Sequence, residues 1–357
     1  MCIMNTFKRT SLIGCILALI GIFIYGCQTQ NITATSGKNW KNLSPIAKHV
    51  YGMTTVVLDD KIHLLGGVHG KDWTDPSDFH QVYDPSDDRW SLRAPIPDPN
   101  GGLGWAMATV YAGQIYLFGG GSGPGLEGSA RVWLYDPTTD AWSRLADMPV
   151  ERINGVAVTA GDYIYIFGGH RLHTPPADEL ISAYKYDPAT DTYQRIENTP
   201  ETATFITRAY YNGHIYAISG LEHEWLGQPE AHPSISYVYG QGVLKYNVRN
   251  DTWTKLNIPR IRQRTFTLTQ LSSNPVIGSK LFVLGGRPTD GQRTNLAAYF
   301  DMQTETFGQI DSMPKGRCCG SAAVVDGKIY VSGGFWADID DVYDCTETWG
   351  YPFGEYE

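Results

Sequence analysis

The side chains best suited to acid–base chemistry stand next to each other at Glu222 and His223. A carboxylate and an imidazole can each accept or donate a proton close to the reacting atoms of a substrate. A nearby arginine would hold an acidic substrate, because a guanidinium group binds a carboxylate through two parallel hydrogen bonds. We therefore predict acid–base catalysis by Glu222 and His223, assisted by Arg317 or Arg262.

Two arginines occupy equivalent positions along the chain. Arg152 precedes Gly168-Gly169, and Arg317 precedes Gly333-Gly334, by the same distance. A fold built from repeats would bring both arginines to a common centre, where they could clamp a carboxylate. The alternative is a structural role, in which both bind backbone carbonyls of a neighbouring repeat. The predicted ligand-binding residues are Arg152, Arg262, Arg264, His170, Trp225 and Trp105.

Six hydrophobic runs each end in a glycine-type pair, and a Tyr-Asp-type pair and an aromatic residue follow each one. The pairs recur about every 50 residues, with a longer gap after the fourth, and this period is typical of repeated β-blades. They are Gly66-Gly67, Gly119-Gly120, Gly168-Gly169, Ser219-Gly220, Gly285-Gly286 and Gly333-Gly334.

Residues 157–196 show one repeat in full. A tight turn at Gly161-Asp162 separates two β-prone runs, and the second run, Tyr163 to Phe167, ends at the glycine pair. After a polar loop, Tyr186-Asp187-Pro188 begins a turn between two outer strands. Each repeat therefore predicts four antiparallel strands, which we call a to d, and no helix is expected outside the extreme N-terminus.

The six motifs make the chain resemble the kelch-repeat proteins from about residue 40 onward. The resemblance implies an all-β fold, a six-bladed kelch β-propeller over residues 39–357. We expect the segment from Trp40 to Pro45 to supply the outer strand of the last blade, beside Val342–Asp344 as its third strand. Pairing the two ends of the chain would remove an open sheet edge. The alternative gives the outer strand to Trp349–Tyr351.

The order of the strands decides which face of the propeller can bind a ligand. Antiparallel strands put the b–c loops and the connections between blades on one face, and the short a–b turns on the other. Long loops on a rigid scaffold are the usual place for binding and catalysis. The fourth b–c loop runs from Leu221 to about Gly242, is the longest, and contains Glu222, His223 and Trp225. We therefore expect the site on the face of the b–c loops.

Among secreted bacterial kelch proteins, the chain resembles the N-acetylneuraminate epimerases, which are sialic-acid mutarotases. That family has a Glu and an Arg in the loop after a fourth-blade Gly motif. Glu222 lies within one position of the expected Glu, whereas the expected Arg position holds Gln228. The resemblance implies a mutarotase of sialic or uronic acids, and the departure leaves two alternatives. One is a non-catalytic glycan- or protein-binding module. The other is a polysaccharide or oligosaccharide lyase, with candidate residues His170, His173, Tyr237 and Arg287.

The N-terminus has a composition of its own. Lys8-Arg9 precedes an apolar run from Ser11 to Tyr25, which is the pattern of a secretory signal. The following Gly26-Cys27 completes a stretch that resembles a bacterial lipobox. We predict a lipoprotein signal peptide over residues 1–26, lipidation of Cys27 and a flexible tether over 27–38, with an uncleaved anchor as the alternative. Gln28 favours the outer membrane of the cell envelope.

Charge and cysteine content narrow the choice of partners. Without Lys8 and Arg9 the chain keeps 26 basic and 37 acidic residues, a net charge of about −11, which argues against a nucleic-acid partner. We expect a carbohydrate or acidic sugar as ligand, membrane contact through the lipid anchor, and a monomer. Cys318, Cys319 and Cys345 lack the spacing of metal ligands, so no metal or cofactor is predicted. Cys318 and Cys319 are expected to be buried thiols.

Overall fold

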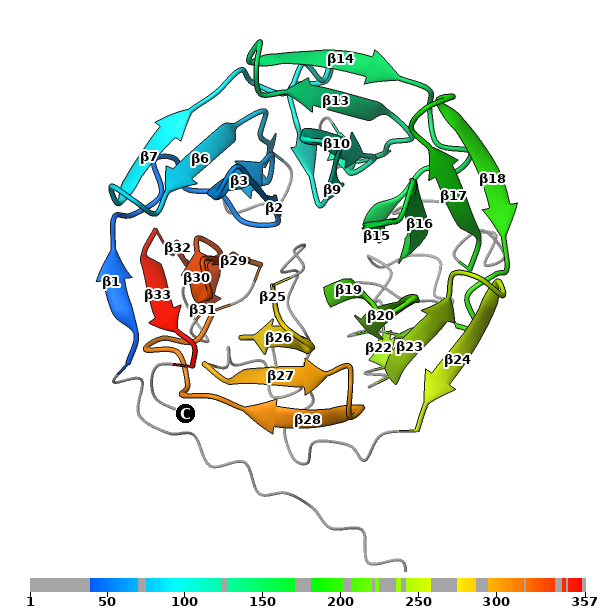
Figure 1. The fold of residues 1–357 in the computed structure, drawn as a ribbon. Helices are drawn as coiled ribbons and strands as arrows, with labels where there is room; N and C mark the ends of the chain where they lie inside the picture. The colour runs from blue at the N-terminus through cyan, green and yellow to red at the C-terminus, as the bar shows by residue number, and fades with distance from the viewer. Residues whose placement is uncertain are drawn as a thin grey trace, which may run out of the picture.

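Six four-stranded antiparallel sheets form a ring in the computed structural model of the protein (Figure 1). The structure describes residues 39–69, 75–122, 127–170, 181–201, 207–219, 222–224, 236–238, 242–257, 275–286, 295–317, 319–337, 342–344 and 346–354. The sheets are blades 1 to 6 in chain order, with strand a innermost and strand d outermost. The prediction of an all-β six-bladed propeller is confirmed.

Blades 1 to 3 make up the first half of the ring, and each contains strands a to d in chain order. Blade 1 has β2 (Thr54–Leu58), β3 (Lys61–Leu65), β6 (His80–Asp84) and β7 (Arg89–Leu92). Blade 2 has β9 (Met107–Tyr111), β10 (Gln114–Phe118), β13 (Val132–Asp136) and β14 (Ala141–Leu145). Blade 3 has β15 (Ile153–Ala160), β16 (Tyr163–His170), β17 (Ala183–Asp187) and β18 (Thr192–Ile196).

The second half of the ring repeats the four-stranded blade. Blade 4 has β19 (Thr207–Tyr211), β20 (His214–Ser219), β23 (Gly242–Asn247) and β24 (Thr252–Leu256). Blade 5 has β25 (Val276–Ile277), β26 (Lys280–Leu284), β27 (Ala297–Asp301) and β28 (Thr306–Gln309). Blade 6 has, from strand a to strand d, β29 (Ser321–Val325), β30 (Lys328–Ser332), β33 (Thr348–Pro352) and β1 (Lys41–Leu43).

Short strands outside the blades form small sheets of their own. They are β4 (Val68–His69), β5 (Asp75–Pro76), β8 (Leu103–Gly104), β11 (Gly121–Ser122), β12 (Glu127–Gly128), β21 (Glu222–Glu224), β22 (Ser236–Val238), β31 (Phe335–Ala337) and β32 (Val342–Asp344).

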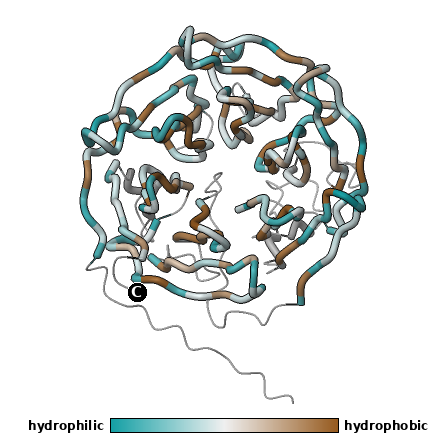
Figure 2. Tube along the Cα trace, in the orientation of Figure 1, coloured by the Kyte–Doolittle hydropathy of each residue, from teal (hydrophilic) through white to brown (hydrophobic). Residues whose placement is uncertain are grey.

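The apolar core lies on strands a to c and between neighbouring blades. The inner strands are the most hydrophobic parts of the ring in Figure 2, whereas strand d is mostly exposed or half-buried, as in β18, where only the last residue is buried. Phe118 of blade 2 and Tyr186 of blade 3 meet edge to face, with ring centroids 5.8 Å apart. Large aromatic side chains therefore fill the space between wedge-shaped blades.

The glycine pairs are joints between blades. Gly66 has a φ of 64°, and a Cβ at this position would lie 2.1 Å from the Leu103 carbonyl oxygen. The next residue, Gly67, donates its N–H to that same carbonyl at 2.8 Å. In blade 2, Gly120 donates to the Arg152 carbonyl of blade 3 at the same distance. Only glycine combines the left-handed conformation with so close an approach of the next blade.

The N-terminal strand closes the ring, as predicted. Lys41 pairs with Gly350, Asn42 with Trp349 and Leu43 with Thr348, so β1 is strand d of blade 6 (Figure 1). Its third strand is β33, and the prediction of Val342–Asp344 in this place is wrong, because these residues form β32 and pair with β31.

A misleading motif explains the error in blade 6. Tyr351 pairs with Ile329, as Tyr186 pairs with Ile164 in blade 3, so Tyr351 is the motif aromatic of this blade. Tyr343-Asp344 has the letters of the motif without its position. All five residues of β33 are buried, which a polar loop segment could not match.

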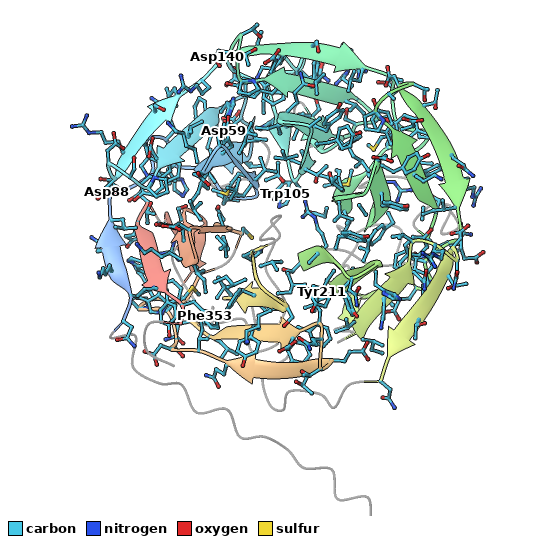
Figure 3. The ribbon with its side chains drawn as sticks, in the orientation of Figure 1. Asp59, Asp88, Trp105, Asp140, Tyr211 and Phe353 are labelled. Carbon is cyan, nitrogen blue, oxygen red and sulfur yellow. The ribbon has the colours of Figure 1, made fainter. Side chains whose placement is uncertain are left out.

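A tyrosine and an aspartate five residues later make the same contact in blades 1 to 4. The tyrosine hydroxyl donates to the aspartate at 2.7 Å, and the aspartate also accepts the N–H of a residue that follows strand d of the preceding blade. An aromatic residue of strand d donates to the carbonyl of that same residue. We call this set the outer staple, and Figure 3 shows Asp88 and Asp140 at the outer rim. The sets are Tyr83, Asp88, Trp90 and Ser44; Tyr135, Asp140, Trp142 and Ala94; Tyr186, Asp191, Tyr193 and Ala146; and Tyr246, Asp251, Trp253 and Glu197.

Candidate functional site

One face of the ring carries β-hairpins. The pairs β4–β5, β11–β12, β21–β22 and β31–β32 extend the b–c loops of blades 1, 2, 4 and 6. In blade 2 the connection from blade 1 adds a third strand, β8. Antiparallel geometry puts all of these on the side of the connections between blades. We call this side the hairpin face, and it is the face on which the sequence predicts the site.

Arg152 lies just before strand a of blade 3 and is 2% exposed. Its Nη1 donates to the Gly168 carbonyl at 2.7 Å, and its Nη2 donates to the Ser182 carbonyl at 2.6 Å. The guanidinium group therefore joins the end of strand b to the start of strand c. Both of these carbonyls belong to blade 3 itself, whereas the structural alternative expected carbonyls of a neighbouring repeat.

Arg317 occupies the equivalent place in blade 6 and is 1% exposed. Its Nη1 donates to the carbonyls of Gly333 and Glu347, at 3.0 and 3.2 Å. The guanidinium carbon lies 3.9 Å from the centroid of the Trp349 ring, and Nη2 is 3.8 Å from the Glu347 carboxylate. Burial alone would raise the pKa of Glu347, but a hydrogen bond from Lys315 and the charges of Lys315 and Arg317 lower it. The Glu347 carboxylate is thus the counter-ion of the Arg317 guanidinium group.

The two arginines do not converge. Blades 3 and 6 lie on opposite sides of the ring (Figure 1), and each guanidinium group binds carbonyls of its own blade. The geometry therefore gives no support to a shared carboxylate clamp. The catalytic role of Arg317 and the binding role of Arg152 stay predictions.

Trp105 belongs to a ring of backbone contacts that we call the collar. Cys319, Gly52, Trp105 and Asn154 hold equivalent places in blades 6, 1, 2 and 3, and all have a positive φ between 51° and 63°. In each case the backbone N–H donates to the carbonyl oxygen of the equivalent residue in the preceding blade. The distances are 2.8 Å from Gly52 to Cys319, 2.8 Å from Trp105 to Gly52, and 3.0 Å from Asn154 to Trp105. Trp105, labelled in Figure 3, is 8% exposed, and its indole packs edge-on against Tyr51. Little of its surface is left to stack on a sugar.

Several predicted residues can be placed only by their backbone, or lie outside the described residues. Glu222 and His223 occupy successive positions of β21, opposite Val238 and Tyr237 of β22 on the hairpin face. His170 ends β16 opposite Ile153. The predicted residues outside the described part are Arg262, Arg264, Trp225, His173, Arg287, Cys27, Cys318 and Cys345. Cys319 is buried, as expected.

A histidine–aspartate pair on the hairpin face was not among the predicted site residues. His69 Nδ1 lies 3.1 Å from Asp75 Oδ2 across the β4–β5 hairpin, and the side chains are 41% and 65% exposed. The imidazole stacks on Phe79 with an interplanar angle of 11°. The carboxylate and the aromatic ring together orient an exposed imidazole, which can donate or accept a hydrogen bond toward a ligand. The position of His69, two residues after the Gly66-Gly67 pair, is a signal that sequence reasoning could have used.

Asp98 was also missed, and its contacts are structural. It lies on the connection from blade 1 to blade 2 and accepts hydrogen bonds from Ser122 Oγ at 2.6 Å and from Arg131 Nη1 at 3.1 Å. The Asp98 side chain is fully buried. A buried carboxylate needs such partners, so this network holds the blade 2 hairpin to the ring.

Within the described ranges, no three His, Cys, Asp or Glu side chains gather as a metal site would require. In the same part of the chain, no helix has the length and apolarity to cross a membrane.

The comparison with known protein families agrees with this architecture. The Attractin/LZTR1 β-propeller family matches residues 22–292, and a kelch motif matches residues 316–347. The chain belongs to the Attractin/LZTR1 β-propeller family. As an Attractin/LZTR1-type propeller it is a kelch-repeat protein, and the motif match covers strands a and b of blade 6 and ends just before β33.

Individual relatives of this Attractin/LZTR1-type propeller are distant. Kelch-like protein terF of Aspergillus terreus is 25% identical over 93% of this chain and 72% of its own length. Kelch-like protein 23 of Homo sapiens is 26% identical over 82% of this chain and 46% of its own length. Kelch-like protein 25 of Xenopus tropicalis is 28% identical over 45% of this chain and 25% of its own length. The chain thus spans less than half the length of the last two relatives.

Proposed function

We propose that this propeller is a carbohydrate-binding module that binds its ligand on the hairpin face. The observation that carries the proposal is the gathering of sugar-binding residue types on hairpins of one face. They are His69, Asp75, Glu222, His223, Tyr237 and Trp336. Carboxylates and imidazoles bind sugar hydroxyls, and aromatic rings stack on the apolar faces of sugars.

Binding without turnover fits the described contacts better than catalysis does. Arg317, the cation predicted to assist acid–base chemistry, is buried and engaged with backbone carbonyls and with Glu347. A mutarotase of sialic or uronic acids is the second candidate. It is favoured by one observation, the position of Glu222 in a hairpin of the same face.

The cellular setting is a separate part of the proposal. The lipobox-like sequence before Cys27 supports a lipid-anchored protein of the cell envelope, at the outer membrane. Expression of the full chain with an alkyne-labelled fatty acid, followed by capture and mass spectrometry, should label the wild type and leave Cys27→Ser unlabelled. Equal labelling of both proteins, or none in either, contradicts lipidation at Cys27.

Binding is tested with soluble protein from residue 28 onward on a panel of neutral, sialylated and uronate-containing glycans. For the best glycan, His69→Ala should weaken the affinity at least about fivefold, since it removes an oriented hydrogen-bonding group. Asp84→Ala is the matched control, because Asp84 lies at a c–d turn on the other face. The proposal fails if no glycan binds, or if His69→Ala and Asp84→Ala bind the glycan equally well.

Turnover is tested separately from binding. Proton NMR on freshly dissolved sialic and uronic acids should show no faster anomeric equilibration than in buffer. Acceleration that is lost in Glu222→Gln would replace the binding module with the mutarotase. A new absorbance of unsaturated sugar on uronate polymers would instead indicate a lyase.

A further inference from the structure

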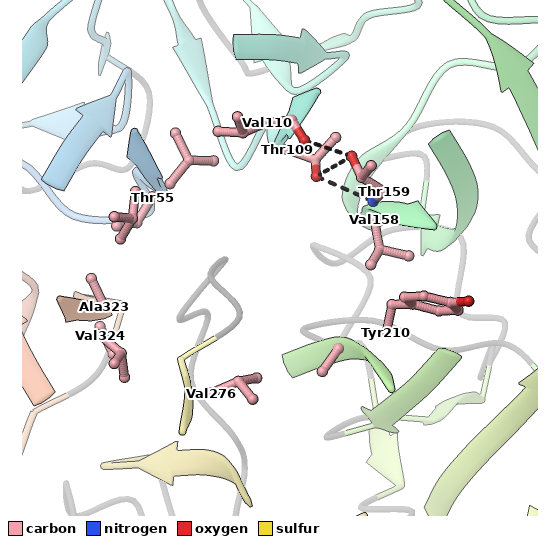
Figure 4. Close-up of a pocket in the computed structure, with 13 residues that line it drawn as sticks. Thr55, Thr109, Val110, Val158, Thr159, Tyr210, Val276, Ala323 and Val324 are labelled. Carbon is pink, nitrogen blue, oxygen red and sulfur yellow. Dashed lines mark hydrogen bonds between the residues drawn. The ribbon is translucent and has the colours of Figure 1, made fainter. Parts of the chain in front are cut away.

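A pocket of about 330 Å³ lies at the centre of the ring, on the half opposite the hairpin face. Each blade contributes to it the residue that stands two places before its a–b turn (Figure 4). These residues are Val57, Val110, Thr159, Tyr210, Val276 and Val324. None of the six is fully buried, and Tyr210 is 42% exposed. We call this space the channel pocket.

On strand a, the residue two places before the pocket residue belongs to a deeper layer that narrows the channel. Four of its five described members are small, namely Thr55, Ala108, Ala157 and Ala322, and each is at most 1% exposed. The fifth member is Arg208, which is also 1% exposed. One long side chain therefore occupies the middle of the ring, next to Ala209 in the pocket wall.

Arg208 spans three blades without a matched anion. From blade 4 its Nε donates to the Ala157 carbonyl of blade 3 at 3.0 Å, and its Nη2 donates to the Ala108 carbonyl of blade 2 at 2.7 Å. Its Nη1 is buried and has no hydrogen-bond partner. Among the residues that the structure describes, no carboxylate pairs with it. Burial lowers the pKa of Arg208 to about 10, so the group stays charged at neutral pH.

The pocket walls suit a molecule with an apolar body and a polar end. Valines and alanines are most of the lining residues, but the lining surface is more polar than apolar, and Arg208 lies behind it rather than in the lining. Thr109 and Thr159 share a hydrogen bond at 3.0 Å, and Thr159 also donates to the Val110 carbonyl (Figure 4). A buried positive charge near a concave wall attracts anions more strongly than an exposed charge does.

We propose that the channel pocket binds a small organic carboxylate, with its apolar body against the valines and its anionic end at the Arg208 layer. A pocket of this size holds a molecule of one ring. The anion would offset the unmatched charge of Arg208, which is costly to bury alone. This site is distinct from the hairpin face, and it does not depend on glycan binding.

The test compares two ligands of the same shape. Isothermal titration calorimetry of the protein from residue 28 onward is performed with benzoate and with benzamide, which lacks the charge. Benzoate should bind at least about tenfold more tightly, and added salt should weaken its binding. Absence of benzoate binding, or equal affinities for the two ligands, would overturn the proposal.

Two variants locate the site. Val324→Trp fills the pocket and should abolish benzoate binding, whereas Leu92→Trp places the same ring on an outer strand that is already exposed and should change nothing. Retained binding in Val324→Trp contradicts the location. If Val324→Trp fails to fold, line broadening of Ala209 and Tyr210 signals by benzoate decides the location. Glycan binding by Leu92→Trp and Val324→Trp should match the wild type, which separates this proposal from the first.

Discussion

The junction between blades 3 and 4 and the junction between blades 4 and 5 are built differently. At the first, Asp251 accepts from the Tyr246 hydroxyl and from the Glu197 N–H, and Trp253 donates to the Glu197 carbonyl. At the second, Phe300, Glu305 and Phe307 stand at the corresponding positions, and a phenylalanine ring has no polar hydrogen to donate. Glu305 binds Lys245 of blade 4 at 2.7 Å instead.

The difference shows that the propeller has two ways to hold neighbouring blades. The staple at the first junction makes three hydrogen bonds, of which only the one from Tyr246 to Asp251 is partly buried. The ion pair at the second junction is between side chains that are 24% and 38% exposed. Exposed ion pairs contribute little to stability. We therefore expect the junction between blades 4 and 5 to be the weaker one.

The largest expected effect is a loss of stability at acidic pH, and it arises at the stapled junction between blades 1 and 2. His63 and His80 share a hydrogen bond at 2.8 Å, and His80 packs against the staple residues Tyr135 and Trp142. Burial lowers the pKa of His63 to about 4 and that of His80 to about 3. The unfolded chain binds protons first as pH falls below about 6.5, so stability is lost from there toward pH 4.

Urea titrations from pH 7 to pH 4 measure this loss. We expect the free energy of unfolding to fall by on the order of 3 kcal/mol for each of the two histidines. His80→Phe should flatten the part of the curve between pH 6.5 and pH 4. An unchanged slope in that variant would show that other groups dominate acid unfolding.

Removing a staple should come next in size. Asp251→Ala leaves the Tyr246 hydroxyl and the Glu197 N–H without their acceptor and puts alanine at a φ of 53°. The free energy of unfolding should fall by about 2–3 kcal/mol. Asp251→Asn is the matched control, because asparagine keeps an acceptor oxygen and tolerates this backbone conformation. Equal losses in both variants would contradict the hydrogen-bond explanation.

Building a staple into blade 5 should give a smaller gain. Phe300→Tyr with Glu305→Asp places a hydroxyl and a short carboxylate near Asn257, which follows β24 as Glu197 follows β18. Stability should rise by about 1 kcal/mol in urea unfolding. Phe300→Tyr alone, which adds the hydroxyl without its acceptor, should not stabilise the protein. A gain of the same size from the single change would break the comparison.

The ion pair itself should matter least. Glu305→Ala should cost less than about 1 kcal/mol, and the loss should shrink in high salt. Lys245→Ala tests the same pair from the other side, although it also removes the ammonium group from above the Tyr216 ring. A loss as large as that of Asp251→Ala would mean that the two junctions are equally strong.

Repetition explains why the fold could be predicted from the sequence. The glycine pairs recur because each blade must let the next connection approach its backbone, as Gly66 does for Leu103. The closing strand could be predicted because Trp40 begins a d-type strand with no inner strands before it. The last blade misled the prediction because Tyr343-Asp344 copies the motif letters, whereas Tyr351 occupies the motif position.

For the candidate site, the sequence predicted only which face of the propeller carries it. Spacing shows that Arg152 and Arg317 are equivalent, but not that their guanidinium groups reach carbonyls of their own blades. The constant spacing of tyrosine and aspartate in the sequence identifies the staple aspartates. It does not show that each aspartate also binds the backbone of the preceding blade. Arg208 is one of several arginines in sequence, and only the small residues around it in the ring make its charge conspicuous.

The closing strand also sets how the ring responds to mechanical force. β1 and β33 run antiparallel, so the chain enters beside Lys41 and leaves after Pro352 at the same end of the pair. Tension between the two termini would load the three residue pairs one after another, first Lys41 with Gly350 and last Leu43 with Thr348. A seam loaded in this order opens like a zipper, and it resists far less force than strands pulled in shear. If Cys27 holds the protein to a membrane, this seam is the part of the propeller that takes the strain.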